Sequence, residues 1–474
     1  LTATAAAFKN TAQMSHIGMF VEINGGIIEI TSVTSSTVVV GVVRKTMTGL
    51  ANAFAGSWSI KQSLILLAYA ATPGPGKIVD HFKSGCSFEG RLVLGGTSQY
   101  PNRLTMSASG EYLNFATGVN DNDAISRDLD GYDQILHVVP SNRLYVFTYA
   151  AEYAVSGSDN GPVTPLSVIA RAYTSYGSSP TVQPVRAGKD VVIVQRIGQR
   201  VRGYSYQFSQ DDFEAPDFTV RHPTITGAGV VRLVYSDAPY QIMWAVLADG
   251  SAALMCVDRP SGTYAWSTFK TDGVILDAAS LPESSGDNVY LFVKRNIAGV
   301  DKYMVERVDY QYSTHCGIVA SGAASDTWPV AHLDTETVDI LADDVPMNQE
   351  AVTSGNVTLP RNASSVEIGL PFTSTITLLP AEFAAQDGSI MGEKAQLSSV
   401  MLRLVRTRGL SVNGEQVLYR QLDEPILDAP TLPFTGDKVI GQMGWEENQK
   451  EITITRTQPL AFHISAIKRT MQVN

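Results

Sequence analysis

The chain has few cysteines, few histidines and few charged residues. Its 474 residues include 3 cysteines and 7 histidines, and Asp, Glu, Lys and Arg together make up 17%. The cysteines, Cys86, Cys256 and Cys316, lie in distant segments, which indicates free thiols in a reducing compartment and not a disulfide framework. The scattered histidines form no H-E-x-x-H motif, so we predict no metal site.

The chain also lacks a surplus of positive charge. It has 35 Lys and Arg against 46 Asp and Glu, a formal net charge of −11. A protein that holds nucleic acid by its phosphates needs clustered Lys and Arg, so this balance argues against such a function. It does not exclude a protein through which DNA only passes.

Long apolar runs are missing as well. The longest candidate, residues 64–71, is far shorter than the roughly 18 residues of a membrane helix. A basic segment followed by a cleavage site is absent, so nothing predicts secretion. The chain begins at Leu1, not at Met, and continues in Ala and Thr. We expect its first region to belong to a larger, truncated domain.

Five short apolar runs recur at intervals of roughly 50 residues, a spacing typical of propeller blades. They are 91–94 (RLVL), 143–147 (RLYVF), 190–194 (DVVIV), 242–246 (IMWAV) and 288–293 (NVYLFV). Each is too short for a buried helix, and most are followed by a turn and a second apolar run. One such unit cannot bury its own apolar face, so we expect neighbouring units to stack around an axis. A β-sandwich is the alternative interpretation, although it would not explain the long period.

The expected fold class is all-β, a β-propeller with additional sandwich-like or barrel-like domains. Residues 1–76 form an N-terminal region with a hairpin at 26–31 and 38–43, and Pro73 to Gly76 mark a junction. Residues 77–310 form the propeller and 311–331, rich in Gly, Ala and Ser, a linker. Residues 332–474 form a separate all-β domain. The one short helix that we expect spans 380–386.

Motifs of known catalytic and cofactor sites are absent. A G-x-S-x-G elbow is missing, residues 74–77 (GPGK) lack the remainder of a P-loop, and 227–229 (GAG) lack the third glycine of a dinucleotide fingerprint. His315 and Cys316 are adjacent, but neighbours in a strand face opposite sides, so one metal could hardly bind both. We therefore expect no catalytic, cofactor-binding or metal-binding residues, and no enzyme activity.

Two acidic loops deserve consideration, because glycosidases need two carboxyl groups about 5 to 10 Å apart. Their residues are Asp121, Asp123, Asp128 and Asp130 in the first loop and Asp211, Asp212, Glu214 and Asp217 in the second. The first resembles a calcium loop but lacks its glycine and its final glutamate. The repeated box of sialidase propellers is absent. Solvated loop charge is the favoured interpretation; calcium binding and catalysis are the alternatives.

Basic and aromatic residues supply the remaining candidates. The basic clusters are Arg196, Arg200 and Arg202 at a hairpin tip, and Arg403, Arg406 and Arg408 before Gly409. Such charges protect edge strands from aggregation; contact with a neighbouring subunit or with DNA are the other options. Tyr173, Tyr176 and Tyr204 could bind sugar if they were exposed, although core positions are commoner for strand tyrosines.

A series of motifs resembles one protein family. Residues 82–97 read FKSGCSFEGRLVLGGT, and Pro101, 106–107 (MS), 109–110 (SG) and 112–115 (YLNF) follow. Further matches are 244–246 (WAV) with 249–250 (DG), 265–266 (AW) with 271–273 (TDG), Tyr303 with 306–307 (ER), 366–372 (VEIGLPF) with 379–380 (LP), and 444–445 (GW) with 452–454 (ITI). In this order they resemble the tail nozzle proteins of short-tailed bacteriophages (podoviruses), also called tail tubular protein B. The resemblance spans most of the chain from about residue 58.

This resemblance implies a structural protein of the virion. The family forms a ring, usually a hexamer, at the distal end of the tail, and DNA leaves the capsid through its channel. The implied partners are other copies of the chain, the tail adaptor, tail fibres and, transiently, double-stranded DNA. The implied location is the phage tail, after assembly in the host cytoplasm. No catalytic residue carries over; Phe88 and Leu92 would be core, and Gly95 with Gly96 a turn.

The chemistry of a conduit agrees with the charge balance, because a basic channel would trap a polyanion. The alternative function is a receptor-binding or polysaccharide-binding propeller of a phage tail, with a glycosidase less favoured.

Overall fold

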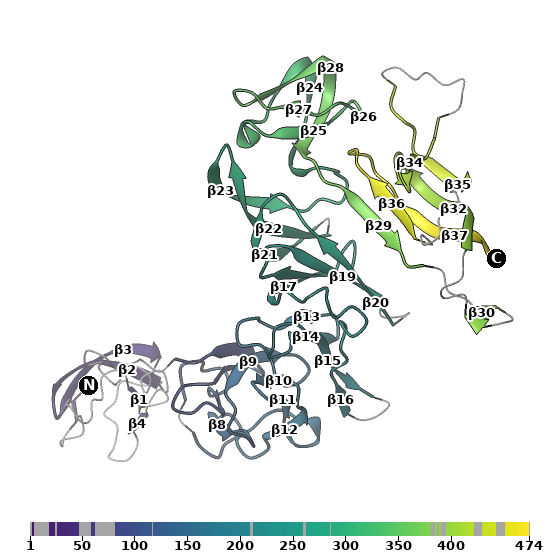
Figure 1. The fold of residues 1–474 in the computed structure, drawn as a ribbon. Coiled ribbons are helices and arrows are strands. Elements are labelled where there is room, and N and C mark those ends of the chain that lie inside the picture. Colours follow the sequence, from purple (N-terminus) through teal and green to yellow (C-terminus); the bar gives the residue numbers. More distant parts are fainter. Residues whose placement is uncertain are drawn as a thin grey trace. The chain divides into compact units, whose positions relative to one another are not determined.

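The protein is described here by a computed structural model (Figure 1). The structure describes residues 2–3, 19–23, 26–46, 58–61, 81–115, 117–208, 212–258, 262–284, 286–380, 384–385, 388–389, 395–420, 429–441 and 451–473. Within these ranges the fold is all-β, as predicted, with two short 3-10 helices, η1 (Ser158–Asn160) and η2 (Ala331–Leu333). The same residues contain no helix long and apolar enough to span a membrane.

The chain divides into two compact units. The first comprises Leu1–Ala248 with Ala253–Ser267, and the second Asp249–Ala252 with Thr268–Asn474. The predicted domain boundaries stay predictions.

The first unit begins with a small sheet in the order β3-β2-β1-β4. Its strands are β1 (Phe20–Ile23), β2 (Gly26–Ser35), β3 (Val38–Lys45) and β4 (Trp58–Lys61). The predicted hairpin is confirmed as β2 and β3, and Val21, Ile30 and Val39 form its buried core. The expected junction at residues 73–76 lies outside the described residues.

Four sheets of four strands follow, each with its strands in chain order. Sheet 1 contains β5 (Ser84–Phe88), β6 (Arg91–Gly95), β7 (Arg103–Met106) and β8 (Ile125–Asp128). Sheet 2 contains β9 (Ile135–Pro140), β10 (Leu144–Thr148), β11 (Glu152–Ser156) and β12 (Ile169–Thr174). Sheet 3 contains β13 (Val185–Ala187), β14 (Asp190–Val194), β15 (Val201–Gln207) and β16 (Asp212–Glu214). Sheet 4 contains β17 (Val230–Ser236), β18 (Ile242–Leu247), β19 (Ala252–Asp258) and β20 (Thr263–Phe269).

The second unit begins with a three-stranded sheet. Sheet 5 contains β21 (Val274–Glu283), β22 (Gly286–Ile297) and β23 (Val300–Arg307). The five recurrent runs of the sequence therefore form β6, β10, β14, β18 and β22, the second strand of sheets 1 to 5. The repeat predicted from the sequence is a repeat of whole sheets.

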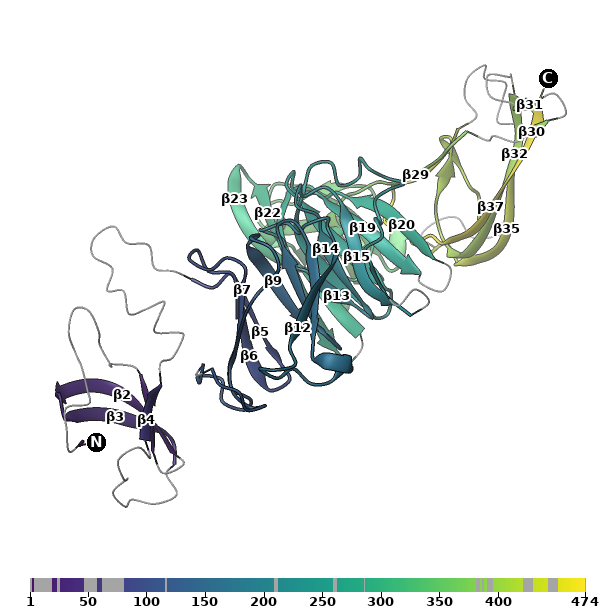
Figure 2. The same cartoon turned by 90° about the horizontal axis from the view of Figure 1, so that it is seen from below.

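Alternate side chains of β10 enter two different hydrophobic clusters. Leu144 and Val146 belong to a cluster with Val93 of sheet 1. Tyr145 and Phe147 belong to a second cluster, with side chains of sheet 3. Neighbouring residues of a strand face opposite sides. Sheet 2 is therefore covered on both faces, by sheet 1 and by sheet 3, an arrangement that Figure 2 shows from below.

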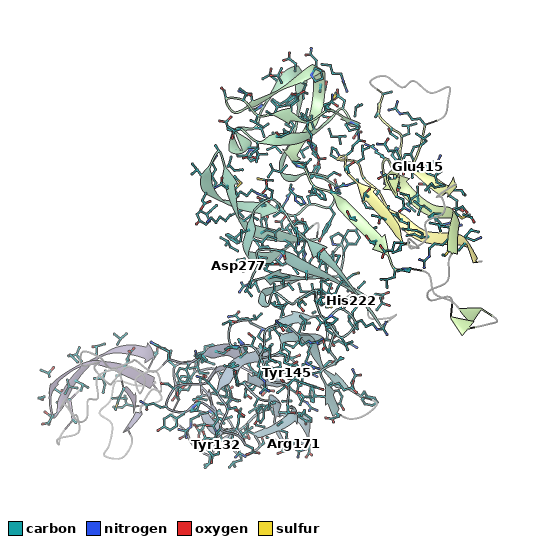
Figure 3. All side chains as sticks on the ribbon, in the orientation of Figure 1. Tyr132, Tyr145, Arg171, His222, Asp277 and Glu415 are labelled. Atoms are coloured by element: carbon teal, nitrogen blue, oxygen red, sulfur yellow. The ribbon has the colours of Figure 1, made fainter. Side chains whose placement is uncertain are left out.

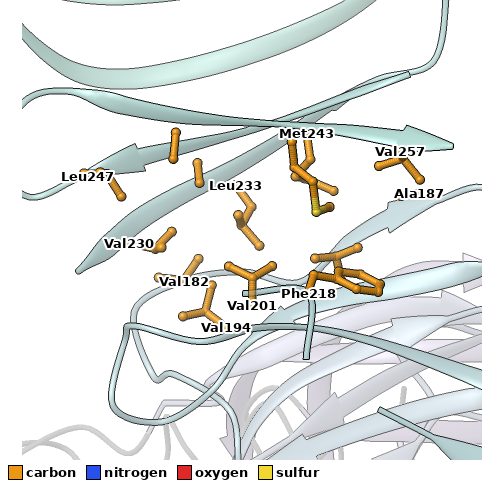
Figure 4. Close-up of a cluster of buried hydrophobic side chains, with 14 residues drawn as sticks. Val182, Ala187, Val194, Val201, Phe218, Val230, Leu233, Met243, Leu247 and Val257 are labelled. Carbon is orange, nitrogen blue, oxygen red and sulfur yellow. The ribbon is translucent and has the colours of Figure 1, made fainter. Parts of the chain in front are cut away.

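Strand β14 repeats this division in sheet 3. Val191 and Ile193 face the aromatic cluster shared with sheet 2, whereas Val192 and Val194 enter a cluster with Met243 of sheet 4. Figure 4 shows this second cluster, with Val194 and Val201 of sheet 3 below Leu233, Met243 and Leu247 of sheet 4. Burial of both faces explains why β10 and β14 read as continuous apolar runs.

Consecutive stacked sheets of four strands agree with propeller blades. Within the described residues, however, no strand pairing joins sheet 4 to sheet 1. The all-β class and the repeated four-stranded sheets are confirmed, and a closed propeller stays a prediction.

The remainder of the second unit is built from longer strands. Sheet 6 contains β24 (His315–Pro329), β25 (Thr337–Ala342), β26 (Val345–Pro346), β27 (Glu350–Ala351) and β28 (Asn356–Leu370). Sheet 7 contains β29 (Ser374–Leu378), β33 (Ser411–Val412), β34 (Glu415–Gln416) and β36 (Ile452–Arg456). Sheet 8 contains β32 (Ala395–Thr407), β35 (Phe434–Gly441) and β37 (Ile464–Val473), and β30 (Ala384–Ala385) pairs with β31 (Gly388–Ser389).

Two expectations for this region differ from the structure. The segment 311–331, expected to be a linker, is largely strand β24, which pairs with β28. Its small residues show no apolar pattern that would predict a strand. Backbone hydrogen bonds, which do not depend on side-chain size, nevertheless hold it in the sheet. The helix expected at 380–386 is also wrong in its described part, since residues 384–385 are strand β30 and 381–383 and 386 lie outside the described residues.

Candidate functional site

The acidic loop that begins at residue 121 is organised by a buried arginine. Arg91, only 3% exposed, donates from Nη1 to the carbonyl oxygens of Ser107 (2.8 Å) and Asp123 (2.6 Å). Its Nη2 donates to the carbonyl oxygen of Asp121 (2.5 Å). Backbone carbonyls are calcium ligands, and here they surround a guanidinium group. The role of Arg91, which the sequence shows only as the start of the run 91–94, was not predicted, because it lies 30 residues before Asp121.

The carboxylates of this loop point to separate partners. Asp128 forms a pair with Arg103 (Nε to Oδ1, 2.6 Å), and the carboxylate of Asp123 accepts a hydrogen bond from the backbone of Asn120 (3.0 Å). Asp121 and Asp130 are exposed. This dispersal supports the interpretation as solvated loop charge.

The second acidic loop and the first basic cluster neutralise each other in part. Arg200 lies 3.4 Å from a carboxylate oxygen of Asp217, and Arg202 donates to the carbonyl of Ala215 (2.8 Å). Arg196 is exposed at the hairpin tip. Asp212 is exposed and Glu214 half-buried in β16, and Asp211 lies outside the described residues.

The second basic cluster does not lie on an edge strand as expected. Arg403 and Arg406 belong to β32, the middle strand of sheet 8. Arg403 pairs with Asp437 directly opposite it on β35 (2.8 Å), and Arg408 pairs with Asp344 (2.9 Å). The regular alternation of faces along β32 ends at Arg406, whose φ is +48° and where the register shifts.

The three candidate tyrosines do not form an open aromatic surface. Tyr204 is fully buried, and Tyr173 packs against Phe213 with ring centroids 4.6 Å apart. Tyr176 is 37% exposed, but the guanidinium of Arg202 lies 3.6 Å from its ring centroid. Stacking of a sugar ring on these residues would require their present neighbours to move.

The His315 and Cys316 pair does not follow strand alternation. Cys316 has a φ of +50°, and the β24 register shifts between His315 and Ile318. The Cys316 Sγ contacts the Sδ of Met304 (3.2 Å), and burial raises the pKa of the thiol to about 12. A thiol with so high a pKa is a poor nucleophile and metal ligand. Within the described ranges, no group of three or more His, Cys, Asp or Glu side chains could hold a metal ion.

His315 instead belongs to a buried polar cluster that begins in sheet 5. Arg295, 1% exposed, forms a bidentate pair with Glu306 (2.6 and 2.8 Å). Its Nη2 donates to Thr271 Oγ1 (2.8 Å), and its Nη1 donates to the carbonyl of Asp272. The guanidinium charge is thus paired and well hydrogen-bonded, as a buried ion requires.

The cluster continues into sheets 6 and 7. His315 Nδ1 lies 3.0 Å from Thr271 Oγ1, and the imidazole stacks on Phe372 with ring centroids 4.0 Å apart and planes 12° apart. The guanidinium of Arg456, on β36, lies 4.4 Å from the centroid of the same ring. Phe372 is therefore in contact with an imidazole and with a guanidinium.

Two buried carboxyl groups complete the cluster. Glu367 accepts hydrogen bonds from the backbone of Ser313 (2.5 Å) and from Thr314 Oγ1 (3.0 Å), and Asp339 accepts one from Gln349 (2.8 Å). Burial raises the pKa of both carboxyl groups, and burial lowers the pKa of Arg456. We call the set the charged junction; it consists of Thr271, Arg295, Glu306, His315, Asp339, Glu367, Phe372 and Arg456.

The charged junction contains no arrangement for nucleophilic catalysis. Burial, followed by the nearby charge of Arg295, lowers the pKa of His315 to about 4, so its imidazole is neutral at pH 7. The groups lie on six strands and two connecting segments between residues 271 and 456. No short motif could have revealed them as one cluster. In the sequence, Thr271, Glu306, Glu367 and Phe372 were named only within motifs of the family resemblance, and His315 only beside Cys316.

A second feature is an exposed apolar face on sheet 5. Phe292 of β22 (44% exposed) lies opposite Val305 of β23 (62%), and Tyr303 of β23 (72%) is two residues away. Strand β21 adds Val274 and Leu276, which are 42% and 47% exposed. Asp277, labelled in Figure 3, is the β21 residue opposite Phe292. The residues between these positions, such as Leu291 and Val293, are buried on the other face.

Comparisons with known proteins add little. No model of a known protein family matches the chain, and no curated protein matches it. One similar solved structure is a protein from Lactobacillus plantarum, with a TM-score of 0.30 and 11% identity over 61% of this chain and 89% of that chain. Another is a protein from Bacteroides fragilis, with a TM-score of 0.24 and 9% identity over 63% and 84%. Both similarities are too weak to assign a family.

Proposed function

We propose that this protein is a structural component of a short-tailed bacteriophage tail, a subunit of the ring-shaped nozzle through which genomic DNA passes during ejection. The observation that carries the proposal is the ordered series of motifs between residues 82 and 454 that resembles tail nozzle proteins. The proposed partners are other copies of this chain in a ring, usually a hexamer in that family, together with the tail adaptor and fibres.

The positions of these motifs support a structural role for them. Phe88 is 7% exposed and Trp244 2% exposed, and Gly96 adopts a left-handed φ of +71° at the end of β6. Leu92, expected in the core, is half-buried. These are packing and turn positions, and none of them carries a reactive group.

The charge of the chain also supports a conduit. The net charge of −11 is repeated in every subunit of a ring, and Arg200, Arg403 and Arg408 already have carboxylate partners. A surface of this kind repels phosphates and so lets DNA move.

The exposed apolar face of sheet 5 is the surface that we assign to a neighbouring subunit. Groups of exposed apolar side chains on a protein surface mark interaction sites, and Lys294, opposite Val274 and Tyr303, adds one charge to this face. A closed ring needs heterologous contacts, in which one face of each subunit meets a different face of the next.

Native mass spectrometry and negative-stain images of the purified chain test the ring. We expect one closed cyclic species, and a wild-type protein that stays monomeric at high concentration would reject the proposal. The double variant Tyr303→Glu/Val305→Glu should release monomers, because it places charge in the middle of the apolar face. Tyr132→Glu, at a residue 96% exposed in the first unit, is the matched control. A ring that survives the double variant would reject only the assigned face.

Binding and activity assays separate the conduit from the alternative, a receptor-binding or polysaccharide-binding propeller. We expect weak binding of duplex DNA that fades between about 50 and 200 mM salt. We expect no release of sugar from host surface polymers. Salt-resistant, submicromolar DNA binding or measurable sugar release would contradict the conduit.

A further inference from the structure

Sheet 6 and sheet 7 have separate hydrophobic cores. Residues of β24, β25, β28 and η2, with Ile297 of β22, form one cluster, which includes Leu333, Val338 and Ile368. Residues of sheets 7 and 8 form another, which includes Leu402, Val412 and Ile454. The two clusters share no residue. Each body therefore has the means to stay folded while it moves relative to the other.

The connection between these bodies is short. Strand β28 ends at Leu370 and β29 begins at Ser374, so residues 371–373 link sheet 6 to sheet 7. Phe372 is the middle residue of this link. Its ring lies against His315 of β24 and Arg456 of β36, at the distances given above. The segment about which the bodies would turn is thus fixed by the charged junction.

An ion pair among the described residues also joins the bodies. Arg408, which follows β32, pairs with Asp344, which follows β25, at 2.9 Å. Asp344 is 58% exposed, so water and salt screen this pair and it contributes little to stability. The buried groups around Phe372 are the stronger connection.

The charges that act on His315 come from three strands, and Phe269 of β20 packs against the imidazole with ring centroids 5.1 Å apart. Arg295 of β22, Glu306 of β23 and Arg456 of β36 act on the imidazole, and the thiol of Cys316 is its neighbour in sequence. Glu367 of β28 and Asp339 of β25 act on Arg456. The charges of Arg295 and Arg456 both disfavour a protonated His315. A protonated His315 would add a third cation near them, with Glu306 already engaged by Arg295.

We propose that the charged junction is an acid-sensitive hinge: at neutral pH it fixes sheets 7 and 8 against sheet 6, and protonation of His315 releases them about residues 371–373. The proposal does not depend on the function proposed above.

The direction of the pH effect follows from the groups themselves. The pKa of His315 in the closed junction, about 4, lies below its ordinary value of 6.5, so the closed form is favoured above pH 6.5 and loses that support as pH falls towards 4. Glu367 and Asp339 act in the opposite sense, because their pKa values are raised in the closed form and protonation relieves the cost of burying their charge. The release is therefore assigned to His315 alone.

Hydrogen–deuterium exchange of the full chain, corrected for the intrinsic pH dependence of exchange, tests the hinge. We expect protection in peptides covering residues 311–318 and 369–376 to fall at least about tenfold between pH 6.5 and pH 4, while the buried strand β10 keeps its protection. The amide of Ser313, which donates to Glu367, lies in the first peptide. Unchanged protection in both peptides, or simultaneous loss in β10, would overturn the proposal.

Variants assign the effect to one side chain. His315→Phe keeps an aromatic ring beside Phe372 but cannot take up a proton, so the loss of protection should disappear. If His315→Phe does not fold, the test uses His315→Asn, which keeps a polar partner for Thr271. His222→Phe, at an exposed histidine of the first unit (Figure 3), is the matched control and should behave as wild type. An unchanged acid response in a folded His315 variant would reject the hinge.

Discussion

Tyr145 of β10 and Tyr204 of β15 meet edge to face, with ring centroids 5.2 Å apart and planes at 83°. They belong to different sheets, so this contact joins sheet 2 to sheet 3. Phe213 stacks on Tyr204 at 5.1 Å and extends the aromatic cluster. The interface between sheets 3 and 4 is instead mainly aliphatic. Sheet 3 thus packs through aromatic side chains on one face and mainly through aliphatic side chains on the other.

Two substitutions of Tyr204 separate packing from polarity. Tyr204→Ala should lower the free energy of unfolding by about 3 to 5 kcal/mol, because it leaves a cavity among rings that are fully buried. Tyr204→Phe should be neutral or stabilising, since among the described residues the buried hydroxyl has no hydrogen-bond partner. Chemical denaturation measures both. A Tyr204→Phe variant as unstable as Tyr204→Ala would show that the hydroxyl has a partner.

Glu152 should make the first unit less stable as pH rises. The residue is fully buried on β11, opposite Phe147, and burial raises the pKa of its carboxyl above 4.5. Its stabilising contribution is present below pH 4.5 and is lost as pH rises through the raised value. Glu152→Gln removes this titration, so its melting temperature relative to wild type should increase between pH 4.5 and pH 7.5. The exposed Glu415→Gln is the control, and equal pH profiles for Glu152→Gln and wild type would contradict the prediction.

Arg91 should matter far more than Arg103, although both lie in sheet 1 beside the same loop. Arg91→Met leaves three carbonyl oxygens without their donor and should cost about 3 kcal/mol of unfolding free energy. Arg103→Met breaks a partly exposed pair with Asp128 and should cost less than about 1 kcal/mol. Equal costs in denaturant titrations would show that the carbonyl contacts of Arg91 do not stabilise the loop.

Two glycines with nearly the same φ separate backbone strain from steric overlap. Gly96 (φ +71°) has no room for a Cβ, because that atom would overlap the carbonyl oxygen of Ile135. Gly110 (φ +74°) has open space at the same position. Gly110→Ala should cost about 1 kcal/mol from strain alone. Gly96→Ala should cost clearly more or prevent folding, as thermal melts of the two variants would reveal; equal melting temperatures would refute the overlap.

The sequence predicted best those strands that are buried on both faces. Residues 190–194 and 242–246 are largely apolar because successive side chains on both faces of each strand are buried, and they appear as β14 and β18 with nearly the predicted bounds. Strand β24 was not predicted, because it consists mainly of small residues that are exposed or half-buried. Its sequence therefore shows no hydrophobic periodicity. Leu92 was placed in the core, although sheet 1 is the first of the stack and has a less covered face.

The charged junction could not be predicted for a different reason. Arg295 and Arg456 are 161 residues apart, and nothing in the sequence links them: Arg295 follows Lys294 in β22, and Arg456 is the single charged residue of β36. The pairing of β28 with β24, the contacts of Phe372 and the hydrogen bonds of Thr271 bring these groups to one place. Long-range topology, which local pattern does not encode, builds the site.

The burial of both faces of β14 also limits which insertions and deletions the protein can tolerate. A one-residue insertion or deletion within this strand would exchange the side chains that face sheet 2 with those that face sheet 4, and so damage two interfaces at once. Insertions in the loops between sheets do not change which face each side chain of a strand occupies. Indels should therefore be tolerated between sheets and rejected within their second strands, and the sheets should be gained or lost only as complete units of four strands.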